Sequence, residues 1–322
     1  MSDIHSKDKQ LFTTSDLLEW TPPHRTRIIS KGVLNVKNRM IIFGDEGCWK
    51  SILAIHTAHC LARGSMWLGF NTYPSNILRL QVELPMYIDR ERLEKYCIGS
   101  KQIYLAKDGH KEVTSEQLDQ LDAKATAFSY PNNAINRTEQ FIHIDESSGW
   151  ESLRKNIETC ITELPEAPLT VILDPLYKMF NRDISAETDV KPLLDKIDLI
   201  MEDAAKSIPG VSFIIVHHTR KSKMDESGRP ISMGSQDATG SRALLRWADT
   251  ILRIDPDPSD NTMTRVQATF TKHRNADDVL PILILRWDRE TLHPQILSRR
   301  MPIYEEEEQL TLRGEQDLSK LE

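Results

Sequence analysis

The chain has 322 residues, of which 39% are hydrophobic and 28% charged, and its formal net charge is −7. This composition is ordinary for a globular protein with a sizeable core, and the acidic balance argues against a surface that coats nucleic acid throughout. The sequence contains no apolar run of the roughly 18 residues that a membrane span needs, and its start lacks the apolar core of a signal peptide. The four cysteines show no C-x-x-C spacing, so we expect neither a zinc site nor a disulfide framework, and a reducing, cytoplasmic setting.

The polar and apolar segments predict one folded domain with two tails. Residues 1–27 are polar and form the expected N-terminal arm, residues 28–300 the expected domain, and residues 301–322 an acidic C-terminal tail. Within the domain, the polar segment 99–140 is expected to be a surface insertion with one helix near 114–127.

Apolar runs typical of strands alternate with segments of helical period along the domain. After an apolar stretch at 28–36, the expected strands are 40–43, 77–82, 141–144, 169–173, 211–216, 249–254, 264–271 and 280–287. The expected helices are 52–62, which Gly64 would end, and 86–96, 150–163, 186–207 and 241–247. Because continuous apolar strands alternate with helices, the pattern predicts an α/β fold with a mostly parallel central sheet flanked by helices. The last strands are expected to be antiparallel additions at one edge of this sheet.

One stretch has the strand–loop–helix layout of a phosphate-binding P-loop, and it reads Gly44-Asp45-Glu46-Gly47-Cys48-Trp49-Lys50-Ser51. Backbone N–H groups of such a loop and the following helix N-terminus bind phosphate, Lys50 would reach the β- and γ-phosphates, and Ser51 would ligate Mg²⁺. Trp49 stands where the G-x-x-x-x-G-K-[ST] pattern has its second glycine. Two outcomes are open: Trp49 adopts helical φ/ψ with its ring outward and still binds phosphate, or glycine's conformational freedom is needed and ATP binds weakly.

Three further candidates stand at the carboxyl ends of expected strands, where open α/β sheets bind their ligands. Asp174 could hold Mg²⁺, or it could simply open a turn before Pro175. Glu83 could accept the proton of a water that attacks the γ-phosphate, or be a solvated loop residue. His218 could contact the γ-phosphate or that water, or be a structural histidine.

Two cations, Lys272 and Arg274, lie far along the chain from the P-loop. They could form an exposed charged face and nothing more. They could instead reach the γ-phosphate of a neighbouring subunit and stabilise transition-state charge, which is the role of an arginine finger.

In this order the motifs resemble those of the RecA-fold hexameric ATPases of the DnaB and RepA helicase group, most of all its compact RepA-type members. The similarity runs from about residue 28 to 290, apart from 99–140. The P-loop stretch is similar to the family's Walker A motif. The family's catalytic-glutamate segment is similar to Val82-Glu83-Leu84-Pro85, with Arg92 nine residues beyond Glu83, and its Walker B strand is similar to Leu173-Asp174-Pro175-Leu176. Its His-His-Thr-x-Lys segment is similar to Val216-His217-His218-Thr219-Arg220-Lys221, its Gly-Ser…Ala-Asp segment to Asp237-Ala238-Thr239-Gly240-Ser241 through Ala248-Asp249, and its Lys-x-Arg-Asn finger to Lys272-His273-Arg274-Asn275.

The resemblance implies ATP and Mg²⁺ as ligands, a nucleotide-site role for Arg92, and a ring of six subunits with ATP between neighbours. It also implies single-stranded DNA in the central channel, faced by the loop 222–240. The cations expected to track the DNA backbone there are Arg220, Lys221, Lys223 and Arg229. A solvated flexible loop is the alternative, because Asp225 and Glu226 are mixed with these cations.

The leading hypothesis is therefore an ATP-hydrolysing, oligomeric motor or helicase on single-stranded DNA, encoded by a plasmid, phage or other mobile element. The alternative is an ATP-switched DNA-binding recombination mediator or loader with slow hydrolysis, because one fold serves several functions. A small-molecule P-loop kinase is a third hypothesis, which predicts a monomer.

Overall fold

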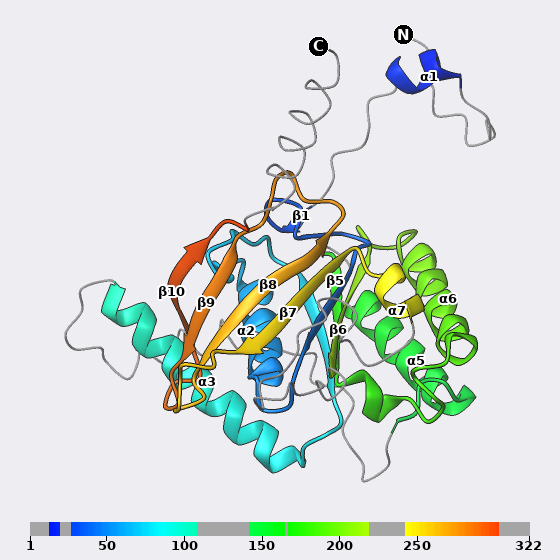
Figure 1. Ribbon diagram of the computed structural model, residues 1–322. Coiled ribbons are helices and arrows are strands. Elements are labelled where there is room, and N and C mark those ends of the chain that lie inside the picture. The colour runs from blue at the N-terminus through cyan, green and yellow to red at the C-terminus, as the bar shows by residue number, and fades with distance from the viewer. Residues whose placement is uncertain (1–12, 20–26, 108–141, 165–166, 219–241, 303–322) are drawn as a thin grey trace, which may run out of the picture.

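The computed structural model describes residues 13–19, 27–107, 142–164, 167–218 and 242–302, and within them its centre is a sheet of eight strands (Figure 1). The order across this sheet is β10-β9-β8-β7-β3-β6-β5-β4. Its strands are β3 (Arg39–Gly44), β4 (Asn76–Gln81), β5 (Leu169–Asp174), β6 (Val211–His218), β7 (Thr250–Pro256), β8 (Arg265–His273), β9 (Ile282–Trp287) and β10 (Pro294–Arg300). A separate antiparallel pair consists of β1 (Arg27–Ile29) and β2 (Leu34–Asn35).

The P-loop strand β3 lies in the middle of the sheet and pairs in parallel with β6 and β7. Parallel pairing continues from β6 to β5 and from β5 to β4. Strands β8, β9 and β10 are antiparallel additions beside β7, and we call these three strands the antiparallel extension. The predicted α/β fold, with a mostly parallel sheet and antiparallel strands at one edge, is confirmed.

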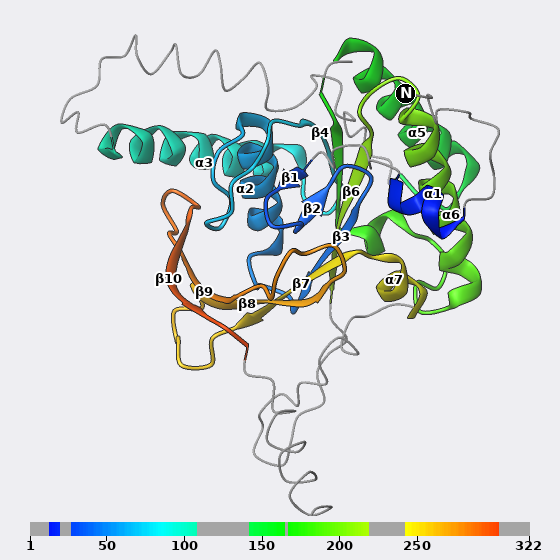
Figure 2. The same cartoon turned by 90° about the horizontal axis from the view of Figure 1, so that it is seen from above.

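Alternate side chains of the buried strands point to opposite faces, so the sheet separates two cores. Met40 and Ile42 of β3 pack in one core, whereas Ile41 and Phe43 pack in the other. The helices are α1 (Thr14–Glu19), α2 (Lys50–Arg63), α3 (Met86–Lys107), α5 (Ser147–Glu163), α6 (Glu187–Ala204) and α7 (Arg242–Trp247), with a short 3-10 turn at Leu176–Met179. Helices α2 and α3 cover the first face, and α5, α6 and α7 cover the second (Figure 2).

The P-loop helix α2 is enclosed by the antiparallel extension as well as by the parallel strands. Phe270, Leu283, Leu285 and Trp287 of that extension belong to the same core as the buried face of α2. At its end, Gly64 takes φ 64° and its N–H donates to the carbonyl of Leu61. The prediction that Gly64 ends this helix is confirmed, since only glycine adopts that conformation without strain.

Two predictions about elements were wrong, and one strand was missed. Residues 142–144 form no strand; Ile144 instead donates its N–H to the carbonyl of Met179. Helix α3 does not end near residue 96 but continues to Lys107, into the segment expected to be an insertion. Strand β10 was not predicted at all. The predicted helix at 114–127 lies outside the described residues, and no helix among those described is both long and apolar enough to cross a membrane.

Candidate functional site

The carboxyl ends of the parallel strands meet at one edge of the sheet. Gly44 at the end of β3 pairs with His218 of β6, and Gln81 at the end of β4 pairs with Asp174 of β5. A cavity of about 440 Å³ opens at this edge. It is lined by residues 46–52 of the P-loop and by Glu83, Leu84, Arg92, Asp174, Val216, His218 and Leu292. The candidates for phosphate, Mg²⁺ and water activation are therefore brought into one cavity.

Lys50 is the first residue of α2 and lies buried in the loop. Its ammonium group donates to the carbonyl oxygen of Asp45, so the loop closes on its own lysine. Burial lowers the pKa of Lys50, and the nearby carboxylate of Asp174 opposes that shift. Because burial raises the pKa of the Cys48 thiol to about 11, Cys48 is a thiol at neutral pH. The lysine is thus the charged group of this loop that can reach a phosphate.

Ser51 and Asp174 form an oxygen-rich pair beside the loop. The Ser51 hydroxyl donates to Oδ1 of Asp174 over 3.0 Å. Asp174 is fully buried, and its Oδ2 has no hydrogen-bond partner among the described residues. Mg²⁺ prefers hard oxygen ligands, and a buried carboxylate oxygen beside a serine hydroxyl fits that ion. The pair therefore suits the Mg²⁺ of a nucleotide site.

A buried arginine, Arg79, balances the charge behind this pair. Its Nη2 lies 3.6 Å from Oδ2 of Asp174, and it donates to both carboxylate oxygens of Asp89 over 2.9 Å. Burial raises the pKa of Asp174, and the Arg79 guanidinium opposes that shift. Sequence reasoning missed Arg79, although an arginine inside the apolar run Ile-Leu-Arg-Leu is itself a signal, since a buried charge needs a partner.

Glu83 is exposed to solvent and oriented by a second residue that the sequence did not reveal. The Tyr177 hydroxyl donates to Oε1 of Glu83 over 3.1 Å, and its ring meets the His218 ring edge to face at 4.8 Å. Burial, followed by the charge of Glu83, raises the pKa of Tyr177 to about 12, so the phenol keeps its proton. Burial and then the Lys50 charge lower the pKa of His218, so the imidazole is neutral at pH 7. The three side chains form a polar wall facing the loop.

Trp49 has a left-handed backbone conformation, which glycine adopts without strain. Its φ of 63° and ψ of 14° are left-handed, so the expected alternative of helical φ/ψ with an outward ring is wrong. Its ring stacks on Trp287 at a centroid distance of 5.6 Å and an interplanar angle of 5°, and Nε1 donates to the Met263 carbonyl over 2.8 Å. A left-handed non-glycine residue costs about 1–3 kcal/mol. An aromatic stack contributes about 0.5–1.5 kcal/mol and a hydrogen bond a similar amount, so the two contacts can offset the strain.

Lys272 and Arg274 lie at the opposite edge of the sheet from the P-loop. The N–H of Arg274 donates to the Asp249 carbonyl, and Asp249 is bonded to Arg39 at the start of β3. Arg39 and Gly44 are the two ends of β3, five residue steps apart, which corresponds to roughly 16 Å along a strand. These two cations are therefore not brought to the cavity of their own chain.

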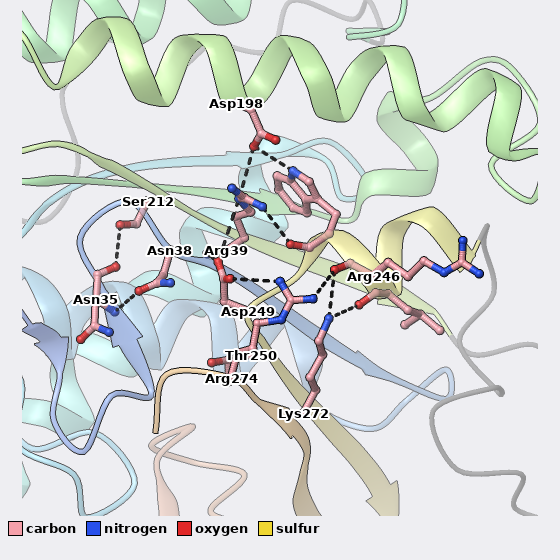
Figure 3. Close-up of polar contacts among 12 residues, drawn as sticks. Asn35, Asn38, Arg39, Asp198, Ser212, Arg246, Asp249, Thr250, Lys272 and Arg274 are labelled. Atoms are coloured by element: carbon pink, nitrogen blue, oxygen red, sulfur yellow. Dashed lines mark hydrogen bonds and ion pairs between the residues drawn. The ribbon is translucent and has the colours of Figure 1, made fainter. Parts of the chain in front are cut away.

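Both cations donate hydrogen bonds to backbone carbonyls in the last turn of α7 (Figure 3). Lys272 Nζ donates to the carbonyls of Leu245 and Arg246 over 2.7 and 3.0 Å, and Arg274 Nη2 donates to that of Arg246 over 3.1 Å. Asp249 lies 3.8 Å from Arg274 Nη1. Helix α7 follows the segment 219–241, so the expected DNA-contacting residues Arg220, Lys221, Lys223 and Arg229 lie outside the described residues.

A family model described as an AAA domain matches residues 6–224, more than half of the chain. The chain belongs to the AAA domain family. Among solved structures, it is similar to one described as an ATPase domain, with 14% identity and a TM-score of 0.53 over 81% of this chain and 85% of that one. A DnaB-like replicative helicase, described with its interactions with primase, aligns at 14% identity and a TM-score of 0.49 over 79% of this chain and 56% of that one. No curated protein matches.

At 14% identity the likeness to the solved ATPase domain concerns the fold, which is that of a RecA-like ATPase domain. Together with family membership it confirms the resemblance to the RecA-fold ATPases of the DnaB group that the motifs indicated. This AAA domain protein is an ATPase.

Proposed function

We propose that this ATPase is a motor that moves along single-stranded DNA as a ring of subunits, in the manner of DnaB- and RepA-type helicases. The observation that carries the proposal is the separation of the two sets of charged groups. Among the described residues, Lys50 and Arg92 are the cations that line the cavity, whereas Lys272 and Arg274 lie at the far edge of the sheet. Transition-state charge on a γ-phosphate needs further cations, which a neighbouring subunit could supply.

In the proposed mechanism, the N–H groups of residues 44–51 and the N-terminus of α2 bind the phosphates of ATP, and Lys50 turns from Asp45 to the γ-phosphate. Ser51 and Asp174 would hold Mg²⁺, which neutralises charge on the β- and γ-phosphate oxygens when bound. Glu83, oriented by Tyr177, accepts the proton of the attacking water. Neutral His218 donates a hydrogen bond to the γ-phosphate or accepts one from the attacking water. Arg92 contacts the nucleotide, and Lys272 and Arg274 of the adjacent subunit approach the γ-phosphoryl group as it is transferred to water, with ADP as the leaving group.

The role of Glu83 is tested by Glu83→Gln beside Lys50→Ala. Both variants are expected to lose hydrolysis, because one lacks the base and the other the phosphate-binding ammonium. Glu83→Gln keeps every phosphate contact and is expected to bind Mg²⁺-ATP with a Kd near the wild-type value, as measured by calorimetry. Loss of ATP binding in Glu83→Gln would remove Glu83 from the role of base.

The shared site is tested by mixing inactive variants. Lys50→Ala subunits keep Arg274, and Arg274→Ala subunits keep Lys50, so mixed assemblies contain some complete sites and should regain ATPase activity. Lys50→Ala mixed with Glu83→Gln is the matched control, since both changes affect the same edge of the sheet. Absence of recovery in the first mixture would favour a monomeric kinase-like site.

The DNA motor itself is tested by strand displacement on a forked DNA with ATP. ATP-dependent displacement supports the proposal, and DNA-stimulated ATPase activity should accompany it. Rapid ATPase activity without displacement or translocation would contradict it. Slow turnover with DNA bound in a single nucleotide state would support the ATP-switched recombination mediator instead. A hexameric ring, the cytoplasmic setting, the mobile-element origin and the division at residues 27 and 300 remain predictions from the sequence.

A further inference from the structure

The contact between Trp49 and the antiparallel extension joins the P-loop to a part of the chain that supplies no residue to the phosphate motif. Trp287 is the last residue of β9, and Met263 belongs to the turn between β7 and β8. Both residues lie more than two hundred positions from Trp49 in the sequence. The stacked rings and the Nε1 hydrogen bond therefore connect the loop to two separate points, the end of β9 and the turn that leads into β8.

The turn that contains Met263 is itself held by hydrogen bonds. Asp260 accepts hydrogen bonds from the backbone N–H groups of Thr262, Thr264 and Arg265 over 3.0, 2.8 and 2.6 Å. The N–H of Trp287 donates to the Thr264 carbonyl over 2.8 Å. Trp287 is 2% exposed, so its ring has a fixed position in the core. The partner ring and the accepting carbonyl are thus held in place before Trp49 meets them.

We propose that Trp49, Trp287 and the turn at 257–264 form a brace that holds the P-loop in its phosphate-binding conformation, in place of the missing glycine. Trp49 and Trp287 are then positioning residues for ATP. This inference rests on the proposed ATP site. Glycine adopts the left-handed conformation unaided, whereas tryptophan adopts it under constraint from its surroundings.

The brace also controls the start of α2. The carbonyl of Trp49 accepts the N–H of Leu53 over 2.8 Å, which is the first hydrogen bond of that helix. If residue 49 returned to negative φ, the peptide before Lys50 would rotate and its N–H would no longer face the phosphate position. Lys50 and Ser51 follow directly in the chain, so both would be displaced. The expected consequence is weaker nucleotide binding with an intact core.

The test is a double-mutant cycle of Trp49→Gly and Trp287→Leu, read by two measurements. Hydrogen exchange of the peptide 44–53 without nucleotide reports the conformation of the loop, and calorimetry with Mg²⁺ and a non-hydrolysable ATP analogue reports binding. In the background that keeps Trp49, Trp287→Leu should speed exchange at the Leu53 amide and raise the Kd, each about tenfold. In the Trp49→Gly background, the same change should alter both by less than about twofold, because glycine needs no brace. Trp150→Leu, which removes a half-buried tryptophan from the other core, is the control and should leave the exchange of this peptide unchanged.

The outcomes separate the brace from the ATP site. Equal effects of Trp287→Leu in both backgrounds, or no effect in either, would overturn the brace while wild-type binding of the analogue still supports the ATP site. Faster exchange confined to the Trp49 background supports the brace even if the wild-type protein binds no analogue, and in that case it is the proposed function that fails.

Discussion

Replacement of Arg79 by methionine tests how the buried charges behind the proposed Mg²⁺ position are balanced. Arg79 lies in the middle of β4, with a side chain 3% exposed between the carboxylates of Asp89 and Asp174. Methionine keeps an unbranched apolar stem of similar length. It removes the guanidinium and leaves two buried carboxylates facing each other.

The magnitude follows from this geometry. Two unit charges at 4 Å attract by about 4 kcal/mol at the effective dielectric of a protein, and the 2.9 Å contacts to Asp89 are closer than that. Desolvation of the charges offsets much of the attraction in the intact pair. Removing one partner leaves that cost uncompensated, which typically lowers stability by about 3–5 kcal/mol. We therefore expect Arg79→Met to lose a large part of the free energy of unfolding, which for a domain is about 5–15 kcal/mol.

Urea unfolding measures this loss, and Arg154 provides the control. Arg154 on α5 makes ion pairs to Glu151 and Glu158 that are shorter than those of Arg79, yet its side chain is 45% exposed. Water screens such pairs, so Arg154→Met should leave the unfolding free energy nearly unchanged. Removing a carboxylate as well, in Arg79→Met with Asp89→Leu, should recover part of the loss. If Arg79→Met lowered the free energy of unfolding by no more than Arg154→Met does, burial would not determine the strength of these ion pairs.

Further predictions concern the polar wall, α7 and acid pH. Tyr177→Phe removes the donor to Glu83 and should lower kcat roughly tenfold with little change in KM for ATP, in a steady-state ATPase assay; an unchanged kcat would contradict the orienting role. Lys272→Met removes the donor to two carbonyls of α7 and should speed hydrogen exchange at 242–248, whereas unchanged exchange would mean that this contact is weak. His56, His59 and His217 are buried, which lowers their pKa values to about 3, 4 and 3. These histidines are neutral in the folded protein but titrate near 6.5 in the unfolded chain, so their contribution to stability is fully present above that pH. The free energy of unfolding should fall by about 1.4 kcal/mol per pH unit for each histidine as the pH is lowered towards 4, as measured by urea unfolding at several pH values. A stability that stays constant from pH 7 to pH 5 would contradict that assignment.

The sequence was sufficient wherever the location of a candidate residue follows from its position along a parallel strand. Asp174 and His218 directly end buried apolar runs, and Glu83 follows one closely, so chain direction alone brings them to one edge. The same reasoning failed for strand β10, whose residues are half-buried or exposed throughout and show little apolar pattern. Helix α3 was expected to end near residue 96, yet it continues through Gly99 to Lys107. That glycine does not stop the helix; a Cβ there would collide with Thr291, so it permits close packing instead.

Long-range side-chain contacts were beyond the sequence pattern. The stack of Trp49 on Trp287 depends on how the antiparallel extension closes over α2, which no local period encodes. Tyr177 reaches Glu83 because a short 3-10 turn follows β5, and that turn has no distinctive signal in the sequence. Arg79 was also missed, although a lone arginine in an apolar strand is a usable signal, because it indicates a buried carboxylate partner even when the partner cannot be identified.

The cavity with Lys50 and the Lys272–Arg274 pair lie at opposite edges of the sheet, and this placement also determines how many complete ATPase sites an assembly of the proposed kind can contain. Each junction between neighbours would unite one cavity with one Lys272–Arg274 pair. An open row of n subunits would then contain n − 1 complete sites, whereas a closed ring would contain n, so closure would add one working site per assembly. Dilution would remove activity by breaking junctions rather than by unfolding chains, and a subunit unable to bind ATP could still activate the neighbour it faces.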